Sequence, residues 1–215
     1  MTYFITYTAH MPYEYWSPEC QNNIKYIMEV FDDDNIEYLC AMSQAKTTDD
    51  SIKLLMDGLE SRNLLDDTVL IFYTDHYAYS MNQDMVSKQK NETDTNLKTK
   101  VPFFIYNNGN YIEVIDKVNS TLDILPTIAD IFGLDYNPNI YFGDSIFNDE
   151  YKGIVVFDDK SWYDGEFYYK EDYIAKENIE YINSVNKYVE DVLKFGGLII
   201  ETDYFNIYDI KNKKR

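Results

Sequence analysis

Two short apolar runs, at 68–73 and 101–106, constrain the fold of this chain more than any other feature. Neither run alternates between apolar and polar residues, a pattern typical of strands that are buried on both faces of a parallel sheet. Ahead of the first run, Ile52, Leu55, Met56 and Leu59 recur at the spacing of one helix face. This alternation of helix and strand predicts an α/β fold with a mainly parallel central sheet flanked by helices.

The first half of the chain offers further local signals. The aromatic and β-branched residues at 3–8 predict a strand that Pro12 then interrupts. For the helix over 52–59, the residues 47–50 supply N-cap candidates, and Arg62 with Asn63 supplies an end. The polar stretch 87–100 predicts a surface loop or a lid.

The second half predicts a helix, a hairpin and another helix. Ser120 and Thr121 cap a helix that runs to Phe132 and stops at Gly133. The runs 154–157 and 162–169 predict an antiparallel hairpin. A final helix is expected from about 176 to 195, ended by the glycines at 196 and 197. We therefore expect two parts, 1–148 and 149–215, the second a C-terminal hairpin-plus-helix subdomain.

The charge balance restricts the partners. The chain has 19 basic and 38 acidic residues, which leaves a net charge of -19. Phosphate backbones and anionic membrane surfaces would repel such a chain, so nucleic-acid binding is excluded. No apolar run approaches the roughly 18 residues of a spanning helix, and the start lacks the pattern of a signal peptide. The two cysteines, Cys20 and Cys40, could form one bridge, and their low number fits a reduced compartment and a bacterial exterior equally well.

The chemistry is expected at the only two histidines, His10 and His76. Each follows a predicted strand, and ligands of open α/β sheets bind at the carboxyl ends of the strands. Asp75 and His76 stand side by side after such a strand, so both side chains can reach one cation. A hard oxygen with an imidazole nitrogen suits Mn²⁺ or Zn²⁺ better than Ca²⁺. Two ligands do not complete a catalytic site, which needs at least three from the protein.

Four segments taken together resemble the alkaline phosphatase/sulfatase superfamily, in particular its lipoteichoic acid synthase-like phosphoglycerol transferases. They are Thr8–Tyr13, Leu64–Tyr77, Lys100–Ile105 and Ser120–Gly133, and they follow one another in the order of the family. The segment 141–145 and the tail at 203–205 continue the match. The resemblance therefore spans nearly the whole chain and makes residues 1–148 the C-terminal half of a sulfatase-like catalytic domain.

The resemblance implies roles for the histidine and aspartate residues. Asp75 and His76 would bind a divalent metal, Mn²⁺ in this branch, with Zn²⁺, Mg²⁺ and Ca²⁺ as alternatives. His10 would hydrogen-bond phosphate oxygens of the substrate. Thr74 and Ala78 stand where the family usually has glycine, which would crowd the turn around the metal.

The resemblance also marks what this sequence lacks. The family's nucleophile and its remaining acidic ligand lie upstream of the His10 segment, and the nine residues before His10 contain no such site. Lys100 is a weaker candidate for a substrate contact, since a lysine at a strand start is usually only solvated. By itself the chain is expected to be catalytically inactive.

The sequence leaves three functions open. The first is the C-terminal part of a metal-dependent phosphoglycerol transferase or hydrolase, extracytoplasmic in its bacterial parent, that acts on a phosphoglycerol- or sulfate-bearing lipid or glycan. The second is part of a sulfatase that cleaves sulfuric esters. The third is a noncatalytic domain that binds an anionic polymer or a carbohydrate, with Trp16 and Trp162 as a stacking platform. Without its first strands, the sheet is also expected to expose an edge through which two copies could pair.

Overall fold

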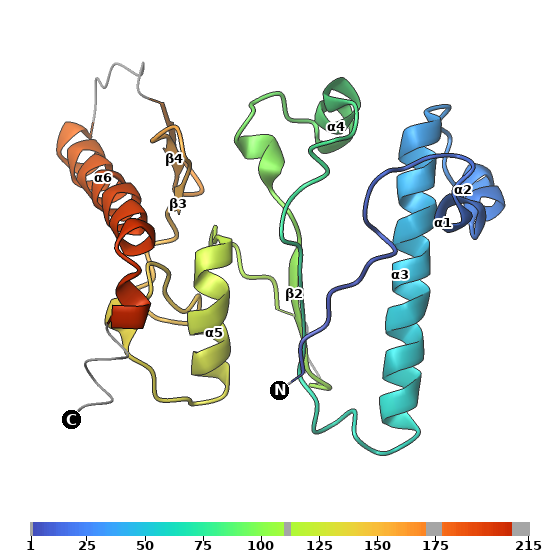
Figure 1. Ribbon diagram of the computed structural model, residues 1–215, viewed down its shortest axis with the longest axis horizontal. Helices are drawn as coiled ribbons and strands as arrows, with labels where there is room; N and C mark the ends of the chain where they lie inside the picture. The colour runs from blue at the N-terminus through green and yellow to red at the C-terminus, as the bar shows by residue number, and fades with distance from the viewer. Residues whose placement is uncertain (1, 110–112, 171–177, 208–215) are drawn as a thin grey trace. The chain divides into compact units, whose positions relative to one another are not determined.

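The computed structural model describes residues 2–109, 113–170 and 178–207, and the chain divides into two compact units at 112/113 (Figure 1). We describe each unit by itself. The boundary expected at 148/149 falls inside the second unit, and the division into a catalytic part and a C-terminal subdomain stays a prediction.

The first unit is mainly helical. Its elements are α1 (Pro18–Gln21), α2 (Ile24–Val30), α3 (Ile36–Glu60), β1 (Leu70–Tyr73), α4 (Gln83–Lys90), a 3-10 turn η1 (Leu97–Thr99) and β2 (Phe103–Tyr106). The stretch 87–100, expected as a loop, therefore contains the end of α4 and all of η1.

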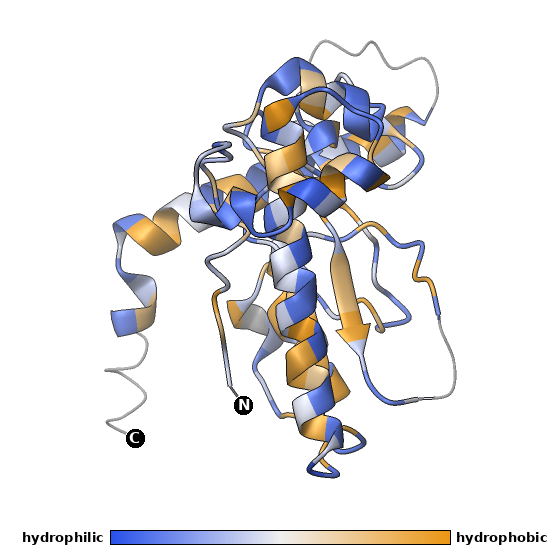
Figure 2. Ribbon diagram, turned by 90° about the vertical axis from the view of Figure 1, so that its right-hand side faces the viewer, coloured by the Kyte–Doolittle hydropathy of each residue, from blue (hydrophilic) through white to orange (hydrophobic). Residues whose placement is uncertain are grey.

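The predicted helix over 52–59 is the C-terminal half of α3, where Figure 2 shows hydrophobic residues gathered. Its end was predicted correctly, since Ser61 is the C-cap and Asn63 has φ 55°. Its start was wrong, because the side chain of Asn35 accepts the backbone N–H of Tyr38 and begins the helix much earlier. The cap candidates at 47–50 consequently lie in the middle of α3.

The class of mixed helix and sheet is confirmed, but the described strands do not form a parallel sheet. β1 pairs with β2 in antiparallel register, with Leu70 opposite Tyr106 and Tyr73 opposite Phe103. Burial on two faces was also wrong for these residues, because Phe104 is 62% exposed. An apolar run without alternation does not specify the direction of its neighbour. The strand predicted at 3–8 is likewise absent, since residues 2–7 have no regular secondary structure and are exposed.

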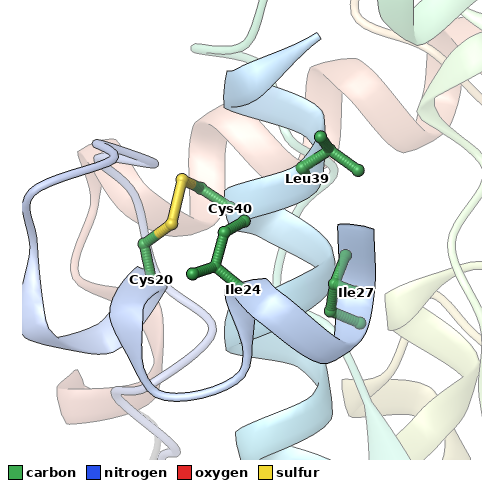
Figure 3. Packing of buried hydrophobic residues seen from close by; sticks show 5 residues of the cluster. All are labelled: Cys20, Ile24, Ile27, Leu39 and Cys40. Atoms are coloured by element: carbon green, nitrogen blue, oxygen red, sulfur yellow. A yellow bond between two sulfur atoms is a disulfide. The ribbon is translucent and has the colours of Figure 1, made fainter. Parts of the chain in front are cut away.

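A disulfide between Cys20 and Cys40 joins α1 to α3. Both cysteines are fully buried, and Ile24, Ile27 and Leu39 pack around them (Figure 3). The bridge that the sequence left open is thus present, at the centre of the apolar cluster that holds the three N-terminal helices together.

The second unit combines a helical part and a small sheet. Its elements are η2 (Thr121–Asp123), α5 (Ile124–Ile131), η3 (Pro138–Ile140), β3 (Val155–Val156), β4 (Trp162–Tyr163), β5 (Tyr168–Tyr169) and α6 (Ile179–Glu201). The predicted helix from Ser120 to Phe132 is confirmed, with Gly133 beyond it at φ 57°. The predicted hairpin is confirmed as β3 and β4, and β5 adds a third antiparallel strand.

Helix α6 differs from the prediction at its end. Gly196 and Gly197 lie inside the helix, which instead ends at Thr202 before Asp203, whose φ is 48°. A glycine ends a helix only where the backbone turns left-handed, and here Asp203 makes that turn. The start expected at 176 lies outside the described residues.

Trp162 forms the core between the small sheet and α6. Its ring is fully buried against Ile182, Val185 and Val189, and its Nε1 donates to Asn186 Oδ1 at 2.8 Å. A buried ring cannot stack on a sugar, so the predicted carbohydrate platform of Trp16 and Trp162 is wrong for Trp162.

The buried carboxylate of Asp123 joins two loops in the second unit. It accepts the backbone N–H of Ser120 at 2.8 Å, that of Asp144 at 3.0 Å and the hydroxyl of Tyr151 at 3.0 Å. The 143–146 loop reaches Asp123 because Gly143 has no side chain. A Cβ added there would lie 2.2 Å from the Leu122 carbonyl oxygen.

Gly143→Ala should lower the free energy of unfolding by about 1–3 kcal/mol, because the added methyl group would push the 143–146 loop away from Leu122. Urea unfolding measures the change. Gly197→Ala is the matched control, since a Cβ there meets nothing within 4 Å and alanine favours the helix. Equal midpoints for the two variants would contradict this account of Gly143.

Replacing Cys20 and Cys40 together by serine should lower the free energy of unfolding by about 3 kcal/mol, because the bridge closes a loop across a sequence separation of 20. Guanidinium unfolding with and without a reducing agent measures the loss. Reduction should destabilise the unmodified chain and leave the double variant unchanged. An unmodified chain that does not respond to reduction would show that the bridge contributes nothing.

Candidate active site

His10 lies in a turn that is hydrogen-bonded to a side chain of α3. The backbone N–H of His10 donates to the Tyr7 carbonyl at 3.0 Å, which closes the turn. With its amide nitrogen facing these carbonyls, the side chain of Gln44 donates to His10 O at 2.9 Å and to Thr8 O at 3.0 Å. Two carbonyl oxygens at that distance require a donor, and this requirement assigns the amide orientation. Gln44 is 1% exposed, so these hydrogen bonds are shielded from water.

Tyr13 adds a second support to the same turn. Its hydroxyl donates to the Ala9 carbonyl at 3.3 Å. Partial burial, followed by the nearby charge of Glu37, raises the pKa of the Tyr13 hydroxyl. The hydroxyl therefore keeps its proton and remains a donor over the physiological pH range.

His76 lies three residues after the end of β1, and its ring is close to that of His10. The centroids of the two rings are 6.4 Å apart at an interplanar angle of 78°. This geometry agrees with the expectation that the two imidazoles lie together, but the segments that position them differ from those expected. His10 comes from a turn held by α3, and only His76 stands after a strand.

Both imidazoles have their Nδ1 atoms engaged by the backbone. His10 Nδ1 lies 2.7 Å from Met11 O, and His76 Nδ1 lies 2.8 Å from Tyr77 O. A carbonyl oxygen accepts only from a protonated nitrogen, so Nδ1 carries the proton and Nε2 keeps a lone pair in the neutral ring. A backbone hydrogen bond of this kind fixes the tautomer and orientation of histidines that bind metals or substrates.

The Asp75 carboxylate stands beside the free nitrogen of His76. Asp75 Oδ1 is 3.6 Å from His76 Nε2, and the Asp75 side chain is 83% exposed. A carboxylate oxygen and an imidazole lone pair at this distance repel each other unless a proton or a cation lies between them. The pair fits part of a divalent metal site by its donor chemistry. Among the residues that the structure describes, no cluster of three or more His, Cys, Asp or Glu side chains could hold a metal alone.

Thr74, which stands where the family usually has glycine, has a buried hydroxyl group. This hydroxyl has no hydrogen-bond partner in the described part of the chain. Such a hydroxyl destabilises the turn before Asp75. Crowding of the metal by Thr74 or Ala78 stays a prediction.

Aromatic and amide side chains complete the surroundings of the two histidines, and little in the sequence marks them. Tyr7 stacks on His10 with ring centroids 6.2 Å apart, and Tyr79 lies 4.8 Å from the His76 ring. In a chain with 22 tyrosines, neither position stood out. Gln44 would have stood out only as a polar residue on the buried face of a predicted helix. The helix predicted from the sequence began after Gln44, so the residue was missed.

The lysine candidate of the sequence, Lys100, is exposed, and no described contact joins its ammonium to either histidine. Another lysine, Lys90, has its Nζ 5.8 Å from the centre of the ring of Tyr77, which is next to His76 in the sequence. Desolvation by partial burial lowers the pKa of Lys90. The role predicted for Lys100 remains a prediction.

Comparison with known sequences identifies the family. The sequence profile of the sulfatase family matches residues 1–134, which include His10, Asp75 and His76. The chain belongs to the sulfatase family. The resemblance to the superfamily, stated above from four segments, is thereby confirmed.

Curated relatives point to the same branch of the family. Lipoteichoic acid synthase 2 of Bacillus subtilis (strain 168) is 24% identical over 180 residues, which cover 78% of this chain and 28% of that protein. Lipoteichoic acid synthase of Staphylococcus aureus (strain NCTC 8325 / PS 47) is 24% identical over 177 residues, 76% of this chain and 27% of that protein. The chain thus spans little more than a quarter of the length of these relatives. Within the described residues, no helix is long and apolar enough to cross a bilayer.

Gln44→Met should lower the free energy of unfolding by about 1–3 kcal/mol, because it removes the amide N–H donors from the Thr8 and His10 carbonyls while keeping a similar side-chain volume. Chemical unfolding measures the loss, and the NMR signals of the His10 ring should shift in the same variant. Gln89→Met is the control, since Gln89 is exposed. Unchanged His10 signals would show that the turn does not depend on Gln44.

Proposed function

We propose that this chain is the C-terminal part of the catalytic domain of a metal-dependent phosphoglycerol transferase. The observation that carries the proposal is the convergence of His10 with Asp75 and His76, 6.4 Å between the histidine rings, inside the segment that matches the sulfatase family. The branch is inferred from the relatives that are called lipoteichoic acid synthases. Their whole activity is not assigned to this chain, which covers only part of their length.

Asp75 and His76 would hold the divalent cation, with Mn²⁺ expected and Zn²⁺, Mg²⁺ or Ca²⁺ as alternatives. When bound, such a cation acts as a Lewis acid toward a phosphoryl group. The chain's own contribution is orientation. The hydrogen bond from His76 Nδ1 to the Tyr77 carbonyl presents Nε2 on the side of the Asp75 carboxylate. The exposed Asp75 carboxylate would offer its oxygens to the cation.

His10 would contact the phosphoryl oxygens of the substrate. Its Nδ1 donates to the Met11 carbonyl, so a proton taken up by Nε2 would be available to an anionic oxygen. Stacking on Tyr7 limits rotation of the ring, and Gln44 limits movement of the turn. His10 therefore would bind and orient the phosphoryl group and would supply a proton at Nε2.

The nucleophile is proposed to come from a segment of the parent enzyme outside this chain. The hydroxyl of Thr8, two residues before His10, is paired with the hydroxyl of Thr48 at 3.2 Å. We propose a phosphoglycerol-bearing lipid or glycan as the substrate. A sulfate ester is the alternative within the same family. The buried Cys20–Cys40 bridge supports an extracytoplasmic location, because disulfides persist in oxidising compartments.

Free Mn²⁺ should raise the stability of the chain through Asp75 and His76. At ten times the dissociation constant, the expected gain is about 1.4 kcal/mol. A thermal melt with and without millimolar Mn²⁺ measures it, and parallel melts with Zn²⁺, Mg²⁺ and Ca²⁺ rank the metals. Asp75→Ala and His76→Ala should each abolish the gain.

The matched control for this experiment is Asp34→Ala, which removes another exposed carboxylate far along the sequence from both histidines. It should respond to Mn²⁺ like the unmodified chain. If the Asp75 and Asp34 variants respond alike, the cation binds elsewhere and the metal assignment fails.

A further inference from the structure

Positive charge is concentrated in one short segment of the first unit. Between residues 87 and 100 the chain has four lysines, at 88, 90, 98 and 100, and two acids, Glu92 and Asp94. Four minus two gives this segment a charge of +2, whereas the whole chain has -19. The segment covers the second half of α4 and all of η1. An anion that approaches this chain is attracted here while most of the surface repels it.

A polar pocket lies in the same segment, between α4 and η1. Its lining includes Ser87, Lys88, Asn91, Glu92, Thr93 and Lys98. Gln83 and Asp84, on the first turn of α4, complete it. The lining combines two ammonium groups, two hydroxyls and two amides with the carboxylates of Glu92 and Asp84. Ammonium, hydroxyl and amide groups all donate hydrogen bonds, so donors outnumber the carboxylate acceptors.

Lys98 is the unusual member of this lining. Its side chain is buried, with 9% of the residue exposed. In the part of the chain that the structure describes, its ammonium makes no ion pair and no hydrogen bond. The Nζ atom of Lys98 is not fully enclosed, so the ammonium at the end of this buried side chain opens into the pocket that it lines. The pocket that Lys98 lines is the place from which a compensating anion can reach it.

The backbone around Lys98 is fixed in place. The Lys98 N–H donates to the Asp94 carbonyl at 3.1 Å, and the Lys98 carbonyl accepts from Lys90 Nζ at 2.7 Å. Lys90 Nζ also donates to the carbonyl of Lys100, so one ammonium ties η1 to the end of α4. The carboxylate of Glu92 is occupied in part by the Asp94 N–H at 2.8 Å. Because these hydrogen bonds hold the backbone around Lys98, the ammonium is already positioned before an anion binds.

We propose that this pocket binds a tetrahedral oxyanion, a phosphate or sulfate group, with Lys98 as the principal charge and Lys88 as the second. Such a group offers several anionic oxygens to the ammonium groups, and the hydroxyls of Ser87 and Thr93 supply neutral donors. The proposal rests on the proposed function only for the origin of the anion, which would be a substrate or product of the same enzyme. Binding of the free ion at this pocket requires neither the metal nor the two histidines.

The test is NMR titration of the whole chain, without metal, with inorganic phosphate and with sodium sulfate, against sodium chloride of equal ionic strength. Signals of Ser87, Thr93 and Lys98 should shift and saturate with phosphate or sulfate and stay in place with chloride. Lys98→Met should weaken binding at least tenfold, and Lys98→Arg should retain it. Lys25→Met is the matched control, because Lys25 is an exposed lysine of α2. Shifts no larger than those with chloride, or equal affinity in Lys98→Met, would overturn the proposal.

A further variant separates this proposal from its alternatives. The double variant Asp75→Ala, His76→Ala should bind phosphate as well as the unmodified chain. Loss of binding there would place the anion at the histidines and overturn the Lys98 site, whereas failure of the Mn²⁺ experiment alone would leave the Lys98 site intact.

Discussion

The interior of the first unit depends on the contacts that the N-terminal half of α3 makes with segments far away in the sequence. Cys40 forms the disulfide to Cys20, and the hydroxyl of Ser43 donates to the Cys20 carbonyl while accepting the backbone N–H of Asn23. The next residue, Gln44, donates to the carbonyls of the His10 turn. Most buried polar groups are hydrogen-bonded, and these side chains hold in place the segments to which they bond. The position of His10 is therefore a consequence of how α3 is anchored.

In the candidate site, backbone hydrogen bonds fix the orientation of both histidine rings. In each histidine, Nδ1 donates a hydrogen bond to a backbone carbonyl. The two Nε2 atoms and the Asp75 carboxylate are then the groups available to a proposed ligand. The Asp75 carboxylate is exposed, and the described residues bring no three His, Cys, Asp or Glu side chains together in a group that could hold a metal. The chain belongs to the sulfatase family and spans little more than a quarter of the length of the lipoteichoic acid synthases.

The first unit has an acidic group beside the histidines and a cluster of lysines at 88–100. A net charge of -19 makes the chain a poor partner for polyanions, and the exposed Asp75 adds to the field that a cation would meet at the histidines. The lysines at 88–100 reverse the sign locally, and Lys98 does so with its side chain buried. The proposed cation site and the proposed anion site therefore depend on local charges of opposite sign within one unit.

The sequence by itself determined the elements whose signals are local, and only the tertiary structure decided those that depend on distant partners. Ser120, Gly133 and the hairpin at 154–169 were predicted because a cap, a left-handed turn and an alternating strand pair are encoded within a few residues. Asp75 and His76 were found as neighbours for the same reason. The antiparallel β1–β2 pairing, the full length of α3, the continuation of α6 through its glycines and the support of His10 by Gln44 were missed. Each of these is settled by a partner tens of residues away, or by packing free energy that exceeds a local propensity of about 1 kcal/mol or less per residue.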